Sequence, residues 1–154
     1  MQTPYKPFIK NQVKDLAHLT ERGMNVTHGD VIIVRCDQSD LPADFNSWPV
    51  AKNLVLAEGE HSGHAHALFQ DGDDSDTYIP PTKPELNVIQ GGKGVVPAGK
   101  FVVRQKGEEM FLVIEGAPML LRHQEHTPFR LYPGTYEIGI QEETWEELRR
   151  RIAD

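Results

Sequence analysis

Five of the seven histidines gather in two short blocks, and imidazole is the commonest metal ligand among protein side chains. The first block, residues 59–66, reads Gly-Glu-His-Ser-Gly-His-Ala-His. The second block, residues 123–126, reads His-Gln-Glu-His. A lone histidine is more often an ordinary surface or core residue. Two such blocks predict a metal site if the fold brings them together.

The spacing within the first block predicts which side chains share a direction. In a β-strand, residues two positions apart face the same side. His64 and His66 would therefore lie together, and Glu60 would join them on that side. His61 would point the other way, so we do not expect it to be a ligand.

The second block leaves a strand at His123 and enters a turn before Pro128. A turn brings residues three positions apart close together, so His123 and His126 can converge on one point. Glu125 lies between them and has three open roles. It could be an oxygen ligand, a hydrogen-bond acceptor for an imidazole N–H, or a general base.

The predicted cofactor is a divalent transition metal, namely Zn, Fe, Ni, Cu or Mn, because neutral imidazoles suit these ions. The predicted ligands are His64, His66, His123 and His126. Four imidazoles leave the charge of the ion uncancelled, which favours an added anion, hydroxide or bound substrate. Metal-assisted hydrolysis would use Glu60 or Glu125 as the base, whereas an Fe(II) site would permit oxygen chemistry. The sequence does not choose between these activities or establish that the protein is an enzyme.

Two rival functions use the same histidines without catalysis. The protein could be a bacterial or phage interaction or assembly protein in which structural, hydrogen-bonded histidines tie strands together or form a pH-sensitive interface. It could also be an RNA-associated accessory protein. His18 and His28 stand alone in the sequence, so we interpret both as ordinary surface or core residues.

The two histidine blocks, followed by Leu131–Tyr136, resemble a family of small uncharacterised bacterial and phage proteins. The start at Gly29–Val31 and the terminal Arg-Arg-Ile-Ala-Asp resemble this family too, so the likeness covers most of the chain from residue 29. It implies no particular activity. In the family pattern the position of His61 is usually not histidine.

A looser resemblance is to cupins, β-barrels whose first motif places His-x-His after a glycine and whose second motif adds a histidine to the same metal. This chain departs from that pattern in its spacing. Four residues separate Gly59 from His64 where cupins have five, and the second block precedes Pro133-Gly134 instead of following it. The cupin resemblance therefore concerns architecture and implies no reaction.

The elements that must position these histidines are short apolar runs separated by glycine and proline turns. Such a pattern predicts a mainly β fold, a single-domain small β-barrel or β-sandwich with short N-terminal and C-terminal helices. A further extended segment continues from the first block to Phe69. The remaining predicted strands are 31–34, 53–57, 101–104, 110–114, 119–121 and 136–140.

One domain is expected over residues 1–154, with an N-terminal helical cap (1–28), a β core (29–140) and a C-terminal helix (141–154). The first helix is predicted over Asn11–Arg22 from apolar residues at intervals of three, and the second from an apolar stripe at helical spacing. The residues of these two patterns are Val13, Leu16, Leu19, Trp145, Leu148 and Ile152.

Composition limits the partners that the sequence predicts. The formal net charge of −7 argues against broad nucleic-acid binding, which normally needs a basic face. No apolar run approaches the length of a membrane span and we see no secretory signal, so we expect a cytoplasmic protein. Cys36 lies in an apolar run, where we expect a buried structural thiol. Small-molecule and protein partners are unidentified, and a homo-oligomer is left open.

Overall fold

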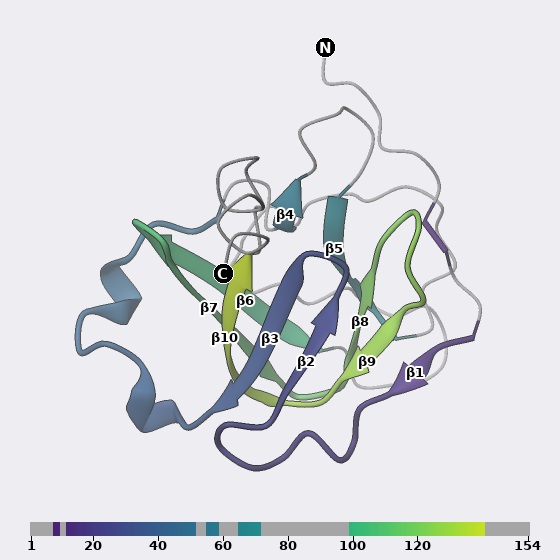
Figure 1. Cartoon of the computed structure of the whole chain (residues 1–154). Helices are drawn as coiled ribbons and strands as arrows, with labels where there is room; N and C mark the ends of the chain where they lie inside the picture. The colour runs from purple at the N-terminus through teal and green to yellow at the C-terminus, as the bar shows by residue number, and fades with distance from the viewer. Residues whose placement is uncertain (1–7, 10–11, 52–54, 59–64, 72–98, 141–154) are drawn as a thin grey trace, which may run out of the picture.

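The computed structural model describes residues 8–9, 12–51, 55–58, 65–71 and 99–140, and these form two β-sheets (Figure 1). The mainly β class is confirmed. Of the two predicted architectures the sandwich fits, because the described strands form two separate sheets and no closed barrel.

The described residues contribute five strands to each sheet. The order in the first sheet is β1 (Lys14–Asp15), β9 (Phe129–Leu131), β8 (Met119–Arg122), β5 (Ala65–Gln70) and β4 (Val55–Glu58). The order in the second sheet is β2 (Asn25–His28), β3 (Val31–Cys36), β10 (Gly134–Ile140), β7 (Glu109–Glu115) and β6 (Lys100–Lys106). Strand β1 pairs with β9 in parallel, and the other neighbours pair antiparallel.

The main core lies between the inward faces of the two sheets. Alternate residues of β5 and β8, such as Leu68 and Leu121, meet alternate residues of β3 and β7, such as Ile33 and Leu112. All four side chains are at most 2% exposed. Because successive strand residues face opposite sides, this alternation also fixes the direction of the residues that follow on each strand.

The outer faces of both sheets are also covered in part. On the first sheet, Ala67, Phe69 and Leu120 pack with Phe8. On the second sheet, the segment with the 3₁₀ helices Gln38–Asp40 and Phe45–Ser47 covers Phe111 and buries Cys36, as predicted for that thiol. Strand β5 is therefore buried along its whole length.

The prediction of a helix over Asn11–Arg22 is wrong for the described residues, which form strand β1 and turns. The interval-of-three pattern has another cause. Leu16 and Leu19 are both buried, but the backbone reaches the core by pairing with β9: the Leu16 N–H donates to the carbonyl of Arg130 at 3.1 Å. The predicted C-terminal helix (141–154) lies outside the described residues.

The predicted strands are found in β3, β6, β7, β8 and β10, and the described part of 53–57 lies in β4. The extended segment to Phe69 is β5. Sequence reasoning missed β2 and β9, which are only four and three residues long. The missed β2 matters most for function, because it carries His28.

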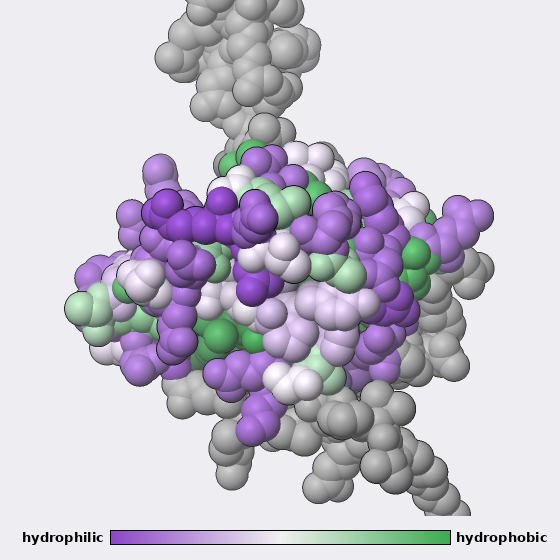
Figure 2. Space-filling model, turned by 90° about the horizontal axis from the view of Figure 1, so that it is seen from below, coloured by the Kyte–Doolittle hydropathy of each residue, from purple (hydrophilic) through white to green (hydrophobic). Residues whose placement is uncertain are grey.

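The face of the molecule seen from below Figure 1 is mainly hydrophilic, with apolar colour limited to small areas (Figure 2). Among the large hydrophobic side chains that the structure describes, Ile140 is exposed, at 41%. In this part of the chain, no helix is both long enough and apolar enough to cross a membrane.

Gln70, at the end of β5, anchors the strand that carries His66. Its amide N–H donates to the carbonyl of Gly99 at 2.8 Å, and its carbonyl accepts the Gly99 N–H at 2.9 Å. The side chain is buried, so both hydrogen bonds are shielded from water. Gly99 directly precedes β6, so this pair joins the two sheets at the end of β5 away from His66.

Replacing Gln70 by Met should lower the free energy of unfolding by about 1–3 kcal/mol, because two buried backbone groups lose their partner. Chemical denaturation at neutral pH measures this change. Gln105→Met is the matched control, since the Gln105 amide makes one exposed, 3.3 Å hydrogen bond to Gly107. A loss no larger than that of the control would contradict the anchoring role.

Candidate functional site

The structure brings His66 of the first block next to His123 of the second block. Strands β5 and β8 pair with Ala67 opposite Arg122 and Leu68 opposite Leu121. Continuing this register by one residue sets His66 opposite His123. Both side chains lie on the inward face, because each follows the alternation of Leu68 and Leu121. Their ring centroids are 4.4 Å apart.

His126 and His28 complete the group, which we call the histidine cluster (His28, His66, His123 and His126). The ring of His126 lies 4.7 Å from His123 and stacks at 6.2 Å on His66. The ring of His28 lies 5.0 Å from His66, 5.6 Å from His126 and 6.4 Å from His123. Four imidazoles from three separate segments therefore share one small region.

A tight hairpin between β2 and β3 positions His28 in this region. His28 ends β2 and pairs with Val31 of β3, so only Gly29 and Asp30 form the turn. Gly29 has φ +61°, as a two-residue hairpin turn of this kind requires. The turn lies beside the loop between β8 and β9 (Figure 1), where the His28 ring packs edge-on against Phe129 at 4.5 Å.

Gly29 also makes room for an imidazole. A Cβ atom at this position would lie 2.6 Å from Nε2 of His126 and 3.3 Å from Nε2 of His66. A side chain there would collide with His126. The glycine is therefore needed both for the turn and for the close approach of the ring.

Two of the imidazoles join separate parts of the fold through ring N–H groups. Nε2 of His66 lies 2.8 Å from the carbonyl oxygen of His28, and Nε2 of His28 lies 2.7 Å from that of Thr127. A carbonyl oxygen only accepts, so each Nε2 carries the proton and donates it. The neutral ring of each residue then keeps its lone pair on Nδ1.

His123 has the opposite proton arrangement. Its Nδ1 accepts the backbone N–H of Glu125 at 2.9 Å, so the proton of the neutral ring lies on Nε2. The neighbouring Gln124 side-chain carbonyl accepts the N–H of Ala65 at 2.9 Å and holds this loop against β5. The loop and the strand are thus positioned together.

Burial keeps the two innermost rings neutral. His28 and His66 are each 2% exposed, and His123 is 7% exposed, whereas His126 is half-buried. Burial, aided by the charges of His126 and His123, lowers the pKa of His28 to about 4. Burial and the neighbouring charges of His123 and His28 lower the pKa of His66 to about 3. Metal ligation requires such neutral imidazoles.

The remaining predicted site residues are placed as follows. Glu125 is exposed on the loop beside His123 and His126. Glu60 and His64 lie outside the described residues, as does His61. Within the described segments, no three His, Cys, Asp or Glu side chains are arranged so that they could hold one ion together.

His28 is the member of the cluster that sequence reasoning missed. It was interpreted as an ordinary turn residue because no second histidine lies near it in the sequence. The available signal was weak: Gly29-Asp30 followed by the apolar run from Val31 indicates a tight turn. Only the pairing of β2 with β3 shows that His28 faces inward.

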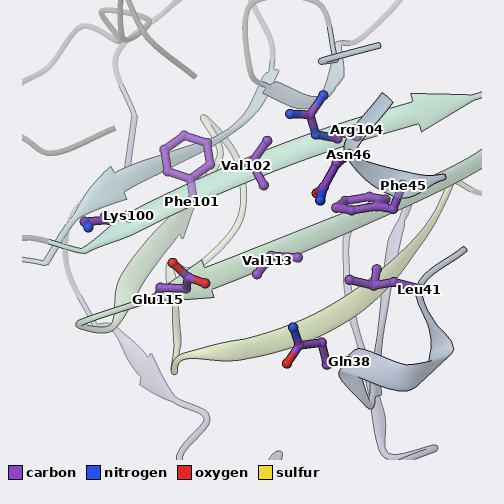
Figure 3. A pocket seen from close by; sticks show the side chains of 10 residues that line it. All are labelled: Gln38, Leu41, Phe45, Asn46, Lys100, Phe101, Val102, Arg104, Val113 and Glu115. Carbon is purple, nitrogen blue, oxygen red and sulfur yellow. The ribbon is translucent and has the colours of Figure 1, made fainter. Parts of the chain in front are cut away.

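A separate cavity of about 470 Å³ opens beside β6 and β7, under the segment with the two 3₁₀ helices (Figure 3). Its walls include Phe45, Val102 and Val113, and Lys100 and Glu115 face each other on neighbouring strands at one end. None of the clustered histidines lines it. This cavity could take a small molecule, but it is not part of the histidine cluster.

Comparison with family models matches residues 27–141 to a domain of unknown function (DUF8820). The matched stretch runs from β2 through β10, and it contains both histidine blocks and His28 but not His18. Comparisons with curated proteins and with solved structures find no match.

Replacing Gly29 by Ala should cost more stability than the same change at Gly107. Both glycines occupy two-residue hairpin turns, with φ +61° and +63°. A Cβ atom at 107 meets nothing within 4 Å, so Gly107→Ala should cost only the backbone strain, about 1–2 kcal/mol. Gly29→Ala should cost about 1–3 kcal/mol more, because His126 must move.

Urea denaturation of both variants measures this difference. Adding His126→Ala to Gly29→Ala should recover most of the extra loss and should recover nothing when added to Gly107→Ala. Equal losses in the two single variants would mean that Gly29 does not confine the His126 ring.

The lowered pKa values of His28 and His66 predict a loss of stability in mild acid. The unfolded chain takes up protons below the ordinary histidine pKa of 6.5, whereas the folded chain resists until pH 3–4. The contribution of these two neutral rings to the free energy of unfolding is therefore complete above pH 6.5. It falls as the pH decreases toward the pKa values of the folded protein. Between pH 7.5 and 5.0, we expect a loss on the order of 2 kcal/mol per residue.

Measuring the free energy of unfolding at pH 7.5 and at pH 5.0 tests this expectation. Both pH values lie above the ordinary pKa values of Asp and Glu. His66→Gln should reduce the pH dependence relative to the wild type. Unchanged pH dependence in His66→Gln would show that this ring titrates normally.

Proposed function

Since the chain belongs to the DUF8820 family, whose description assigns no function, we propose that it binds a divalent transition metal at the histidine cluster. The observation that carries this proposal is the meeting of His66, His123 and His126, three of the four predicted ligands, with centroids between 4.4 and 6.2 Å. The fourth, His64, is two positions before His66.

The electrostatics of the cluster support a cation. Packing several imidazoles in a buried region excludes their protonated forms, because like charges would repel and lose hydration. The same rings, when neutral, offer lone pairs that suit Zn, Fe, Ni or Cu better than Mg or Ca. Zn and Ni should therefore bind, whereas Mg and Ca should not.

Coordination of one ion by three or more side chains requires some of the rings to move, because no three described side chains are arranged to bind the same ion. His126 is half-buried and is therefore the cluster ring most accessible to solvent. His64 and Glu60 could supply further donors from the segment before β5.

A catalytic role stays a prediction. A bound divalent ion would supply Lewis acidity for hydrolysis or, as iron, oxygen chemistry. The exposed Glu125 carboxylate lies on the same loop as two cluster histidines and could accept a proton there. The cupin-like interpretation belongs to this proposal as well, since it rests on the His-x-His spacing at residues 64–66.

A second candidate function, a noncatalytic interaction or assembly protein with structural histidines, is favoured by a specific observation. The His66 and His28 rings each donate to a backbone carbonyl of another segment. These hydrogen bonds hold the sheets together without an ion. The two candidates differ in whether the remaining imidazole nitrogens also bind metal.

Equilibrium dialysis of the full chain against Zn²⁺, followed by inductively coupled plasma mass spectrometry, tests the proposal. We expect about one Zn²⁺ per chain and a rise in unfolding free energy of about 2.7 kcal/mol when free Zn²⁺ exceeds Kd a hundredfold. His126→Ala and His64→Ala should each lower retention at limiting Zn²⁺. His126 is half-buried, so its removal should leave the fold intact.

His18→Ala is the matched control, because His18 is exposed and lies outside the cluster. It should retain Zn²⁺ like the wild type. Substoichiometric metal that is equal in the wild type, His126→Ala and His64→Ala would contradict metal binding and leave the structural candidate.

A further inference from the structure

Building on the proposed metal site, we infer that His28 is itself a ligand, through Nδ1, and that the ion therefore links the two sheets. His28 lies on β2 of the second sheet, whereas His66 lies on β5 of the first and His126 on the loop that joins β8 and β9. His66, His123 and His126 alone would tie the ion to the first sheet.

The main observation behind this inference is that Nδ1 of His28 makes no hydrogen bond to the described residues. Nε2 donates to Thr127, while Nδ1 is fully buried and has no hydrogen-bond partner in the described part of the chain. A buried polar atom without a partner costs free energy, and native structures rarely leave one without a reason. A cation bound to this lone pair would satisfy it.

The proton arrangement of His28 is the one that metal-bound histidines have. A ligating imidazole usually donates its other ring N–H to a backbone carbonyl or carboxylate, which fixes the tautomer and orients the ring. His28 and His66 both donate from Nε2 to a backbone carbonyl and keep the Nδ1 lone pair. Two adjacent rings, 5.0 Å apart, thus share the same ligand-type tautomer.

His123 is a poorer ligand than His28 in the described arrangement. Because its Nδ1 accepts the Glu125 N–H, its neutral ring presents Nε2–H rather than a lone pair. Such a group can donate a hydrogen bond to an anion beside the metal. In the described arrangement His28, which lies outside the two sequence blocks, therefore offers a ring lone pair that His123 does not.

The geometry also explains how His28 reaches the site. The positive φ of Gly29 ends β2 at His28, and the absence of a side chain at 29 brings the hairpin against His126 and His66. A ligand at the very end of a tight hairpin is held by backbone pairing with Val31. Its position should change little when metal binds.

The decisive experiment titrates Zn²⁺ into the full-length wild type and His28→Gln by isothermal titration calorimetry. A glutamine amide can replace the Nε2–H donor to Thr127 but has no nitrogen lone pair to replace Nδ1. We expect His28→Gln to weaken Zn²⁺ binding at least tenfold, with His18→Gln unchanged. Circular dichroism and the unfolding midpoint without metal check that His28→Gln is folded.

Long-range ¹H–¹⁵N NMR spectra of the wild type give a readout that needs no variant. Zn²⁺ should shift the Nδ1 resonance of His28 while its Nε2 remains protonated. If Zn²⁺ binds and His66→Gln weakens binding but His28→Gln does not, with no Nδ1 shift, the proposed metal site stands and the role of His28 is refuted. If the wild type binds no Zn²⁺, both proposals fail.

Discussion

The hydrogen bond from His66 to the carbonyl of His28 is the interaction on which the arrangement of the site depends. It joins β5 of one sheet to β2 of the other in a region where both side chains are 2% exposed. Buried polar groups are stable only when paired, so each imidazole must sit where a backbone acceptor is available. The carbonyls of His28 and Thr127 meet this condition, and they fix which nitrogen of each ring stays unprotonated.

The clustering of histidines in the sequence predicted that the two blocks would meet, and strand geometry explains how His66 of the first block reaches the second. His66 and His123 each continue the inward face of a strand, and the pairing of β5 with β8 sets them opposite each other. What the sequence could not supply is the contribution of the other sheet. His28 has no neighbouring histidine in the sequence. Its inward direction depends on the four-residue strand β2, and the sequence of so short a strand does not reveal its pairing with β3.

Most strands were easier to predict than the N-terminal segment Asn11–Arg22, because their local sequence preference agrees with their packing. Runs such as 101–104 and 110–114 are rich in β-branched or apolar residues and end at turn residues, so local preference and packing agree. Leu16 and Leu19 have a helical spacing, yet the carbonyls of Pro128 and Arg130 accept the backbone N–H groups of Lys14 and Leu16. A short isolated helix would be only marginally stable without such tertiary partners. Tertiary pairing therefore outweighed the local pattern.

Structural and metal-binding histidines differ in the role of the second ring nitrogen, which keeps a lone pair after the first nitrogen has donated its hydrogen bond. A ring that only ties two strands together needs its donor and could be replaced by an amide or hydroxyl that leaves no buried lone pair. His28 instead keeps a buried Nδ1 on a ring whose centroid lies 5.0 Å from that of His66, and burial shields this atom from water. A fold that gathers several such rings, and depresses the pKa of two of them, maintains nitrogen lone pairs at neutral pH. Hydrogen bonding between strands does not require that property, whereas coordination of a cation does.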